Sequence, residues 1–423
     1  MQIHVVAQGQ SLWGISQLYG IPWQRIVDIN GLEQPGQLAV GQTLLIPTQN
    51  RYTVQQGDSF FSIARKTGVT VQELQSANPQ LQGSVLYPGQ VLRIPERAKT
   101  PTIVNAYAEP YEETIANARD AAKALSWLAV FSYHVDAQGN LRQLENDDRL
   151  LQVAKSTGVR PILTITNIKE GADFSTELAT TILSSQQIQT TLINNILTLM
   201  QQKGYTGVNV DFEFLGAENR ERYNQFLRRL VQRMRPQGYI VSTAVAPKTS
   251  ATQEGVLYEG HDYKAHGQIV DYVIIMTYEW GWSGGPPMPV SPLPEVERVL
   301  RYAISEIPKE KVMMGVNLYG YDWTLPFVEG GEFAKALSIP QATRLAYTQR
   351  TEIQYNQEDE APFYTYYDQN GKEHIVWFED LRSYAAKFEL LKRLGIAGMS
   401  FWNLAFSYPP LWVLLQDRFQ IKK

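Results

Sequence analysis

The sequence contains no cysteine, and this absence excludes several kinds of chemistry at once. None of its 423 residues can form a disulfide, bind a metal through a thiolate or act as a cysteine nucleophile. Positive charge is also in deficit, because 38 Lys and Arg face 42 Asp and Glu. A net charge of -4 offers no general attraction to nucleic acid, so we expect no nucleic-acid partner. The remaining catalytic groups are carboxylates, His, Lys, Tyr and hydroxyls.

Long apolar runs are missing as well. No run of about 18 apolar residues occurs, so the sequence predicts neither a membrane-spanning helix nor a membrane partner. The opening residues MQIHVVAQG lack the basic and apolar regions of a Sec signal peptide. The histidines do not have metal-ligand spacing, so we expect no metal and no cofactor. These are His4, His134, His261, His266 and His374.

What the sequence does contain, at its start, is an internal repeat with an offset of 48 residues. Gly9 aligns with Gly57 and Asn30 with Asn78, and the register holds to the end of both copies without a gap. Residues 2–47 and 51–96 are therefore predicted to be two copies of one small α+β unit. Each copy has the pattern of a strand, two helices and a closing strand.

Within each unit, a Ser is predicted to cap the first helix and an Asn to end the second. The caps are Ser11 and Ser59, and the closing strands end in Ile-Pro. These residues resemble the LysM family, whose members bind glycans that contain N-acetylglucosamine. The resemblance implies a peptidoglycan-binding module. Individually, we expect the repeated Gly, Asn and Ile-Pro residues to hold the fold rather than the ligand.

The rest of the chain alternates short apolar runs with helical patterns. Eight strand and helix pairs in about 320 residues are typical of a TIM (β/α)8 barrel. The predicted strands are residues 103–108, 127–133, 160–166, 207–214, 240–246, 269–278, 312–318 and 396–402. Residues 97–101 are predicted to be a linker and residues 102–423 the barrel. An insertion at about 320–378 is predicted to form an α+β subdomain.

The fourth predicted strand carries two carboxylates in alternate positions. Because side chains alternate along a strand, Asn209, Asp211 and Glu213 share one face. Buried carboxylates at the carboxyl end of a barrel strand are typical of a catalytic site. We expect the charge of Asp211 to raise the pKa of Glu213 and keep it protonated.

This strand resembles the signature Asp-Gly-x-Asp-x-Asp-x-Glu of glycoside hydrolase family 18. Gly207, Asp211 and Glu213 match, whereas Asn209 replaces the middle Asp. We expect Asn209 to hydrogen-bond Asp211. Because Asn cannot ionise, this replacement leaves the working pH of the enzyme open. The segments MTYEW, residues 276–280, and GMSFW, residues 398–402, are similar to two further motifs of the family.

The resemblance implies substrate-assisted, retaining catalysis. Glu213 would be the acid and base, Asp211 would orient the substrate's acetamido group, and Tyr278 would donate a hydrogen bond to the acetamido oxygen. Alone, Tyr278 and Trp402 could equally be core aromatics. The expected substrate-binding residues are Asn209, Phe214, Met276, Glu279, Trp280 and Trp402.

The full chain is similar to the spore cortex-lytic N-acetylglucosaminidases of endospore-forming bacteria. The segments APKTSA, residues 246–251, and NLYGYDW, residues 317–323, support this resemblance. It implies hydrolysis of cortex peptidoglycan during germination, and a location in the spore coat or cortex. A catalytically silent glycan-binding protein of the spore coat and a chitinase remain alternatives. The sequence leaves open endo or exo action and the oligomeric state.

Overall fold

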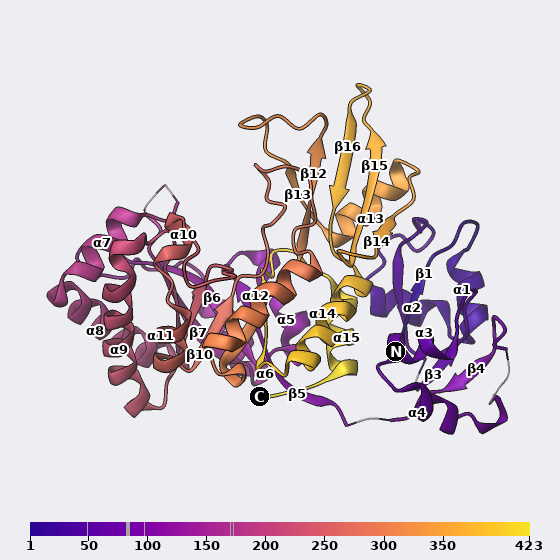
Figure 1. The fold of residues 1–423 in the computed structure, drawn as a ribbon, viewed down its shortest axis with the longest axis horizontal. Coiled ribbons are helices and arrows are strands. Elements are labelled where there is room, and N and C mark those ends of the chain that lie inside the picture. The colour runs from indigo at the N-terminus through magenta and orange to yellow at the C-terminus, as the bar shows by residue number, and fades with distance from the viewer. Residues whose placement is uncertain (49, 82–84, 97, 170, 172) are drawn as a thin grey trace.

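We describe a computed structural model of the chain, which covers residues 1–48, 50–81, 85–96, 98–169, 171 and 173–423. Figure 1 shows three regions: the two small repeats at one end, the barrel, and an upright sheet above the barrel. Within the described ranges, no helix is both long and apolar enough to cross a bilayer.

Each repeat has the predicted strand, helix, helix, strand order. In both repeats the predicted Ser accepts a hydrogen bond from the first turn of its helix, which confirms the two N-caps. The outer strands of each repeat pair antiparallel. The first repeat consists of β1 (Gln2–Val5), α1 (Leu12–Tyr19), α2 (Trp23–Asn30) and β2 (Thr43–Ile46). The second consists of β3 (Arg51–Thr53), α3 (Phe60–Thr67), α4 (Val71–Ser76), a 3-10 turn (Pro79–Leu81) and β4 (Val91–Arg93).

The repeated Asn side chain joins the second helix of each unit to its closing strand. Asn30 donates to the carbonyl of Leu45 at 2.9 Å and accepts from the Leu45 amide at 2.7 Å. Asn78 makes the same two bonds with Arg93, both at 2.8 Å. Because both side chains are buried, these bonds satisfy polar groups that water cannot reach. The Asn therefore holds the fold, as predicted.

The barrel has eight parallel strands, and all eight predicted strands are found. The sheet closes on itself because β17 pairs with β5. The strands are β5 (Thr100–Ala108), β6 (Trp127–His134), β7 (Arg160–Thr166), β8 (Gly207–Asp211), β9 (Ile240–Val245), β10 (Tyr272–Ile275), β11 (Val312–Asn317) and β17 (Gly398–Trp402). A short strand, β18 (Phe419–Ile421), also lies beside β5.

Helices surround these strands, and the main apolar core lies between the two layers. The helical patterns at residues 218–234, 292–307 and 380–394 correspond to α9, α12 and α14. The helices are α5 (Glu112–Ala121), α6 (Asp147–Thr157), α7 (Thr176–Ser184), α8 (Gln186–Lys203), α9 (Arg220–Met234), α10 (Val256–Glu259), α11 (Tyr263–Ile269), α12 (Leu293–Glu306), α14 (Leu381–Leu394) and α15 (Pro409–Arg418).

The predicted helix end at Asn78 was wrong, since α4 ends at Ser76, and three strands begin or end three residues from their predicted bounds. The run predicted at residues 269–278 was too long, because Ile269 ends α11 and the residues from Met276 onward lie past β10. The end of the helix and the strand are both buried, so both are apolar and the sequence does not separate them. Strand β8 ends at Asp211, before the predicted residue 214. Strand β5 begins at Thr100, inside the predicted linker, because residues 100–102 pair with β18. Arg97 of that linker lies outside the described residues.

The insertion forms the upright sheet in Figure 1. Its five strands are antiparallel in the order β13-β12-β16-β15-β14, with one helix against them. The elements are β12 (Tyr319–Thr324), β13 (Lys335–Ser338), α13 (Ile339–Thr348), β14 (Gln354–Asn356), β15 (Ala361–Tyr367) and β16 (Glu373–Trp377).

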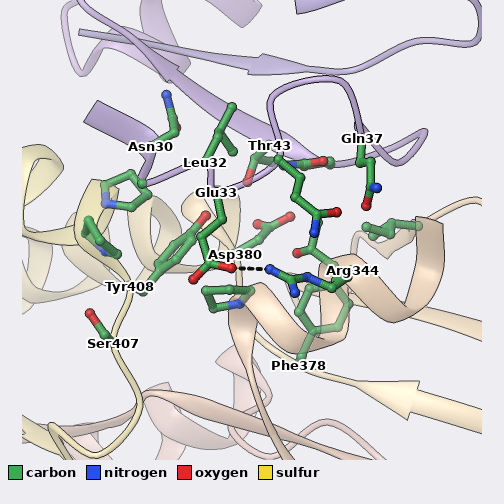
Figure 2. Close-up of a pocket in the computed structure, with 18 of the residues that line it drawn as sticks. Asn30, Leu32, Glu33, Gln37, Thr43, Arg344, Phe378, Asp380, Ser407 and Tyr408 are labelled. Carbon is green, nitrogen blue, oxygen red and sulfur yellow. Dashed lines mark hydrogen bonds and ion pairs between the residues drawn. The ribbon is translucent and has the colours of Figure 1, made fainter. Parts of the chain in front are cut away.

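The first repeat packs directly on the barrel and its insertion. Its Ala39 and Leu45 belong to the main core of the barrel. The Ile353 amide of the insertion donates to the Val40 carbonyl at 2.9 Å. A cavity of about 320 Å³ lies at this junction, and Figure 2 shows the ion pair between Glu33 and Arg344 across it. The sequence did not predict this contact between the two parts.

Candidate active site

A cavity of about 380 Å³ opens at the carboxyl ends of the barrel strands, where catalytic residues of this fold lie. It combines residues that follow β7, β8, β9 and β10 with residues from β6, β17 and the insertion. Its lining includes six of the nine predicted site residues: Asp211, Glu213, Met276, Tyr278, Glu279 and Trp402. The other lining residues are Phe131, Phe174, Pro247, Leu257, Tyr319, Tyr321, Ala336 and Phe406.

Asp211 is the last residue of β8, and only 4% of its surface is exposed. Burial raises the pKa of its carboxyl group to about 7. Its Oδ1 atom is buried and has no hydrogen-bond partner among the residues that the structure describes. A buried oxygen without a partner is costly, so it marks a position where an additional donor would be stabilising.

Glu213 follows two residues later, past the end of the strand. Its pKa is raised well above the usual value, first by burial and second by the charge of Asp211. We predicted that the charge of Asp211 raises this pKa, but burial contributes more to the shift. Both effects favour the neutral carboxylic acid, so Glu213 can donate a proton near neutral pH.

Asn209 does not make the predicted hydrogen bond to Asp211. Its amide donates to the hydroxyl of Tyr107 at 3.1 Å, and its carbonyl accepts from Ser242 at 2.9 Å. Asn209 is buried in the barrel below Asp211 and is not among the residues that line the cavity. It supports the floor of the site rather than the reacting pair.

Tyr278 lies just past β10 and reaches into the cavity beside β11. Burial raises its pKa well above the ordinary value, so its hydroxyl remains a neutral donor. Gly315 makes room for its ring, because a Cβ atom there would lie 2.9 Å from Tyr278 Cε1. The neighbouring Thr277 hydroxyl donates to the Gly315 carbonyl at 2.7 Å and ties the segment to β11.

Glu279 has a backbone φ of 69° and accepts hydrogen bonds from two tyrosines of β12. These are Tyr319 and Tyr321, the second at 3.1 Å. Burial raises the pKa of Glu279, and the two hydroxyls oppose that shift. The insertion thus supplies one wall of the cavity. The segment at 317–323 was singled out by its resemblance, but no role was predicted for Tyr319 and Tyr321.

Trp402 lies at the carboxyl end of β17 within a group of aromatic rings. Its ring lies 4.7 Å from Phe131 and 5.4 Å from Tyr107, both in edge-to-face contact. The indole keeps part of its surface open to the cavity. Phe131 and Tyr107 also lie near the carboxyl ends of their strands, and this position was the signal that sequence reasoning missed.

Two predicted substrate-binding residues do not line the cavity. Phe214 is 40% exposed, and its ring lies 6.4 Å from Phe174, which does line the cavity. Trp280 packs against the main core instead. In the part of the chain that the structure covers, no three His, Asp or Glu side chains gather in a way that could hold a metal ion.

Comparisons with known proteins agree with the fold. Residues 99–406 match the model of glycosyl hydrolases family 18, and residues 4–47 and 52–95 match the LysM domain. The chain therefore belongs to glycosyl hydrolase family 18.

Its relatives include enzymes of one particular kind. The chain is 48% identical to the cortical fragment-lytic enzyme of Bacillus subtilis and 47% identical to that of Bacillus anthracis; both alignments cover 100% of this chain and 99% of the relative. A crystal structure of the Bacillus cereus spore cortex-lytic enzyme SleL superposes with a TM-score of 0.93 at 41% identity, covering 100% of this chain and 99% of that one. The chain is thus a full-length homologue of the cortical fragment-lytic enzymes.

Proposed function

We propose that this protein is an N-acetylglucosaminidase that hydrolyses the β-1,4 bonds after N-acetylglucosamine in spore cortex peptidoglycan during germination. One observation carries the catalytic part of the proposal. The buried carboxyl group of Asp211 and the half-buried one of Glu213, both with raised pKa values, share a cavity with the neutral hydroxyl of Tyr278. The full-length similarity to cortical fragment-lytic enzymes supports the choice of substrate.

The proposed reaction needs no protein nucleophile. Glu213 gives its proton to the glycosidic oxygen while the acetamido oxygen of the substrate attacks the anomeric carbon and forms an oxazolinium ion. Asp211 accepts the acetamido N–H through its unpartnered oxygen, and Tyr278 donates to the acetamido oxygen. The Glu213 carboxylate then takes a proton from a water molecule as that water attacks the anomeric carbon. This step opens the oxazolinium ring and leaves the anomeric carbon with its original configuration.

The repeats are proposed to hold the enzyme on its substrate. Residues 2–47 and 51–96 would bind N-acetylglucosamine units of peptidoglycan, and the hydrolase part would begin with β5 at Thr100. A binding module in the same chain as the catalytic cavity raises the local concentration of the glycan. The proposed location is the spore coat or cortex, which the similarity to spore cortex-lytic enzymes supports.

The decisive experiment measures product release from cortex fragments by mass spectrometry. Glu213→Gln is expected to reduce kcat at least about 1000-fold, because the amide cannot donate a proton to the leaving oxygen. Glu218→Gln is the matched control, since Glu218 is an exposed carboxylate on the same loop and should leave kcat within about twofold. Equal activity in wild type and Glu213→Gln would favour a glycan-binding protein instead.

The pH profile tests the two carboxyl groups separately. Activity should fall as the pH drops through about 7, because Asp211 then loses its charge, and it should fall again as Glu213 ionises at higher pH. Asp211→Asn is expected to remove the acid limb and to lower kcat by about 100-fold or more. A profile with an unchanged acid limb would contradict the role of Asp211.

Substrate preference separates the proposal from a chitinase. Turnover of chitin oligomers and of muramic-lactam fragments can be compared with the same enzyme preparation. We expect faster turnover of the cortex fragments, and faster cleavage of chitin would overturn the cortex assignment. The masses of the products also separate endo from exo action.

A further inference from the structure

The backbone of Glu213 lies where the regular hydrogen bonds of the sheet have ended. Strand β8 stops at Asp211, whose backbone is still in register with Thr166 of β7. Phe214 then turns the chain with a positive φ of 53°. The strand therefore fixes Asp211, but another device must fix the two residues that follow it.

One buried side chain holds both polar backbone atoms of Glu213. Asn167, directly after β7, is fully buried. Its Oδ1 accepts the Glu213 amide at 2.9 Å, and its Nδ2 donates to the Glu213 carbonyl at 2.9 Å. The same Nδ2 also donates to the Ser175 carbonyl at 3.1 Å. Three of the four hydrogen bonds that an Asn side chain can make thus go to backbone atoms.

A second buried side chain holds the residue before the acid. His261 lies in the loop between α10 and α11, and its Nε2 is 2.9 Å from the Phe212 carbonyl. Its Nδ1 accepts the Ala246 amide at 3.0 Å. Because a backbone N–H can only donate, Nδ1 carries no proton and Nε2 must donate to Phe212. Only the neutral imidazole makes both bonds, and burial lowers the pKa of His261 to about 4.

The position of His261 is itself fixed by other buried groups. The Lys248 ammonium donates to the His261 carbonyl at 3.0 Å, and the Lys248 amide donates to the Tyr263 hydroxyl. The rings of Tyr223 and His266 lie 6.2 Å and 6.3 Å from the imidazole. These contacts hold the end of β9 against α11. The position of His261, and through it that of the Phe212 carbonyl after β8, therefore depends on both elements.

We propose that Asn167 and His261 are positioning residues of the catalytic acid and together form a clamp on the peptide units around Glu213. Neither side chain lines the cavity, so neither touches the substrate. The clamp would hold the Glu213 carboxyl in line with the glycosidic oxygen and inside the apolar surroundings that keep it protonated. The inference rests on the proposed function, because it requires Glu213 to be the acid.

The test compares the kinetic constants of four variants on cortex fragments. Asn167→Ala and His261→Leu should each lower kcat about 100-fold and change KM less than about threefold, because a displaced acid affects the transition state more than ground-state binding. His261→Gln keeps a donor that can reach the Phe212 carbonyl, and it should recover at least about tenfold of the loss. Gln189→Ala is the matched control, because the buried Gln189 side chain donates a hydrogen bond to the Leu183 carbonyl, accepts one from Arg229 and does not line the cavity.

The pH profile supplies a readout that simple destabilisation would not move. A Glu213 side chain freed from its clamp reaches water more easily, so the basic limb of kcat should move to lower pH in Asn167→Ala and His261→Leu. It should not move in Gln189→Ala. Activity is expressed per folded molecule, with the folded fraction measured by circular dichroism at the assay temperature.

The outcomes are distinguishable. The clamp is overturned if Asn167→Ala and His261→Leu keep kcat per folded molecule within threefold of wild type and leave the basic limb in place. It is also overturned if Gln189→Ala loses as much kcat as they do. An active Glu213→Gln variant overturns the proposed function instead. An inactive Glu213→Gln together with normal clamp variants removes the clamp alone.

Discussion

The two repeats have the same pattern of residues, but the first packs into the core of the hydrolase, whereas the second meets its surface through polar contacts such as that of Arg418 with the Lys66 carbonyl. Each has its own small apolar core, around Ile15 and Ile26 in the first and around Ile63 and Leu74 in the second. The first repeat also contributes side chains to the core of the barrel, whereas the second keeps its corresponding face in solvent. The residues shared by the two repeats therefore specify the fold of the unit, and the residues that differ between them specify what each unit packs against.

Those other positions are where the two copies differ. Ala39 is 2% exposed, while Tyr87 at the equivalent place in the second repeat is 64% exposed. Leu45 is fully buried against the barrel, while its equivalent, Arg93, is exposed. Comparison of the copies therefore locates the interface: the residue is small or apolar where the repeat is covered and large or charged where it is not.

The largest expected difference between the repeats concerns a shared glycine. Gly41 and Gly89 have φ values of 84° and 87°, but a Cβ atom on Gly41 would lie 2.0 Å from the Ile353 carbonyl oxygen, and one on Gly89 would meet nothing within 4 Å. Gly41→Ala should lower the free energy of unfolding by about 3–5 kcal/mol, and Gly89→Ala by about 1 kcal/mol. Hydrogen exchange followed by mass spectrometry, peptide by peptide, measures both; equal losses would mean that the first repeat is not docked.

A smaller difference is expected for one core position. Leu45→Ala should cost about 3 kcal/mol, because it opens a cavity between the repeat and the barrel. Arg93→Ala should change the free energy of unfolding by less than about 0.5 kcal/mol. Urea denaturation monitored by tryptophan fluorescence measures both variants. A harmless Leu45→Ala would show that the interface contributes little.

The repeated Asn residues should contribute equally to the stability of the two repeats. Asn30→Ala and Asn78→Ala each leave the same backbone groups of a closing strand without partners, so each should cost its own repeat about 2 kcal/mol. Hydrogen exchange in β2 and β4 reports the loss locally. A much smaller loss in the first repeat would mean that docking alone holds β2 in place.

The smallest effects are expected from the surface ion pairs. The first repeat has Glu33 with Arg344, and the second has Arg65 with Glu360 at 3.2 Å. At least one partner in each pair is largely exposed, so Glu33→Gln and Arg65→Gln should each cost less than about 1 kcal/mol, and less still in 0.5 M salt. Thermal denaturation at two salt concentrations checks this, and a large salt-resistant loss would assign either pair a role in docking.

The secondary structure was largely predictable because each element buries a periodic face. All eight barrel strands, three barrel helices and both repeats follow from that periodicity. One failure arises because periodicity does not show where burial passes from helix to strand, as at Ile269. It also gives no sign of contacts distant in sequence, such as that between Val40 and Ile353.

The candidate site was predictable only in part, for a related reason. Asp211, Glu213 and Tyr278 follow from a motif and from the ends of strands. Asn209 was assigned the wrong partner, because the alternation of a strand gives the face of a side chain but not the neighbour across the barrel. His261 gave no signal as a lone histidine in a loop, since its contacts depend on the loop conformation.

If the repeats bind glycan as proposed, the attachment of the second repeat to the first limits how far the anchored enzyme can reach. Gln2 exchanges two hydrogen bonds with the Thr53 backbone, at 2.8 Å and 2.9 Å, so the second repeat is held to the docked first one. A long flexible tether would let one anchoring event present many glycosidic bonds to the cleft. A stiff attachment presents bonds at one fixed separation, so progress along an anchored glycan strand would be stepwise, with release of the repeats between cuts.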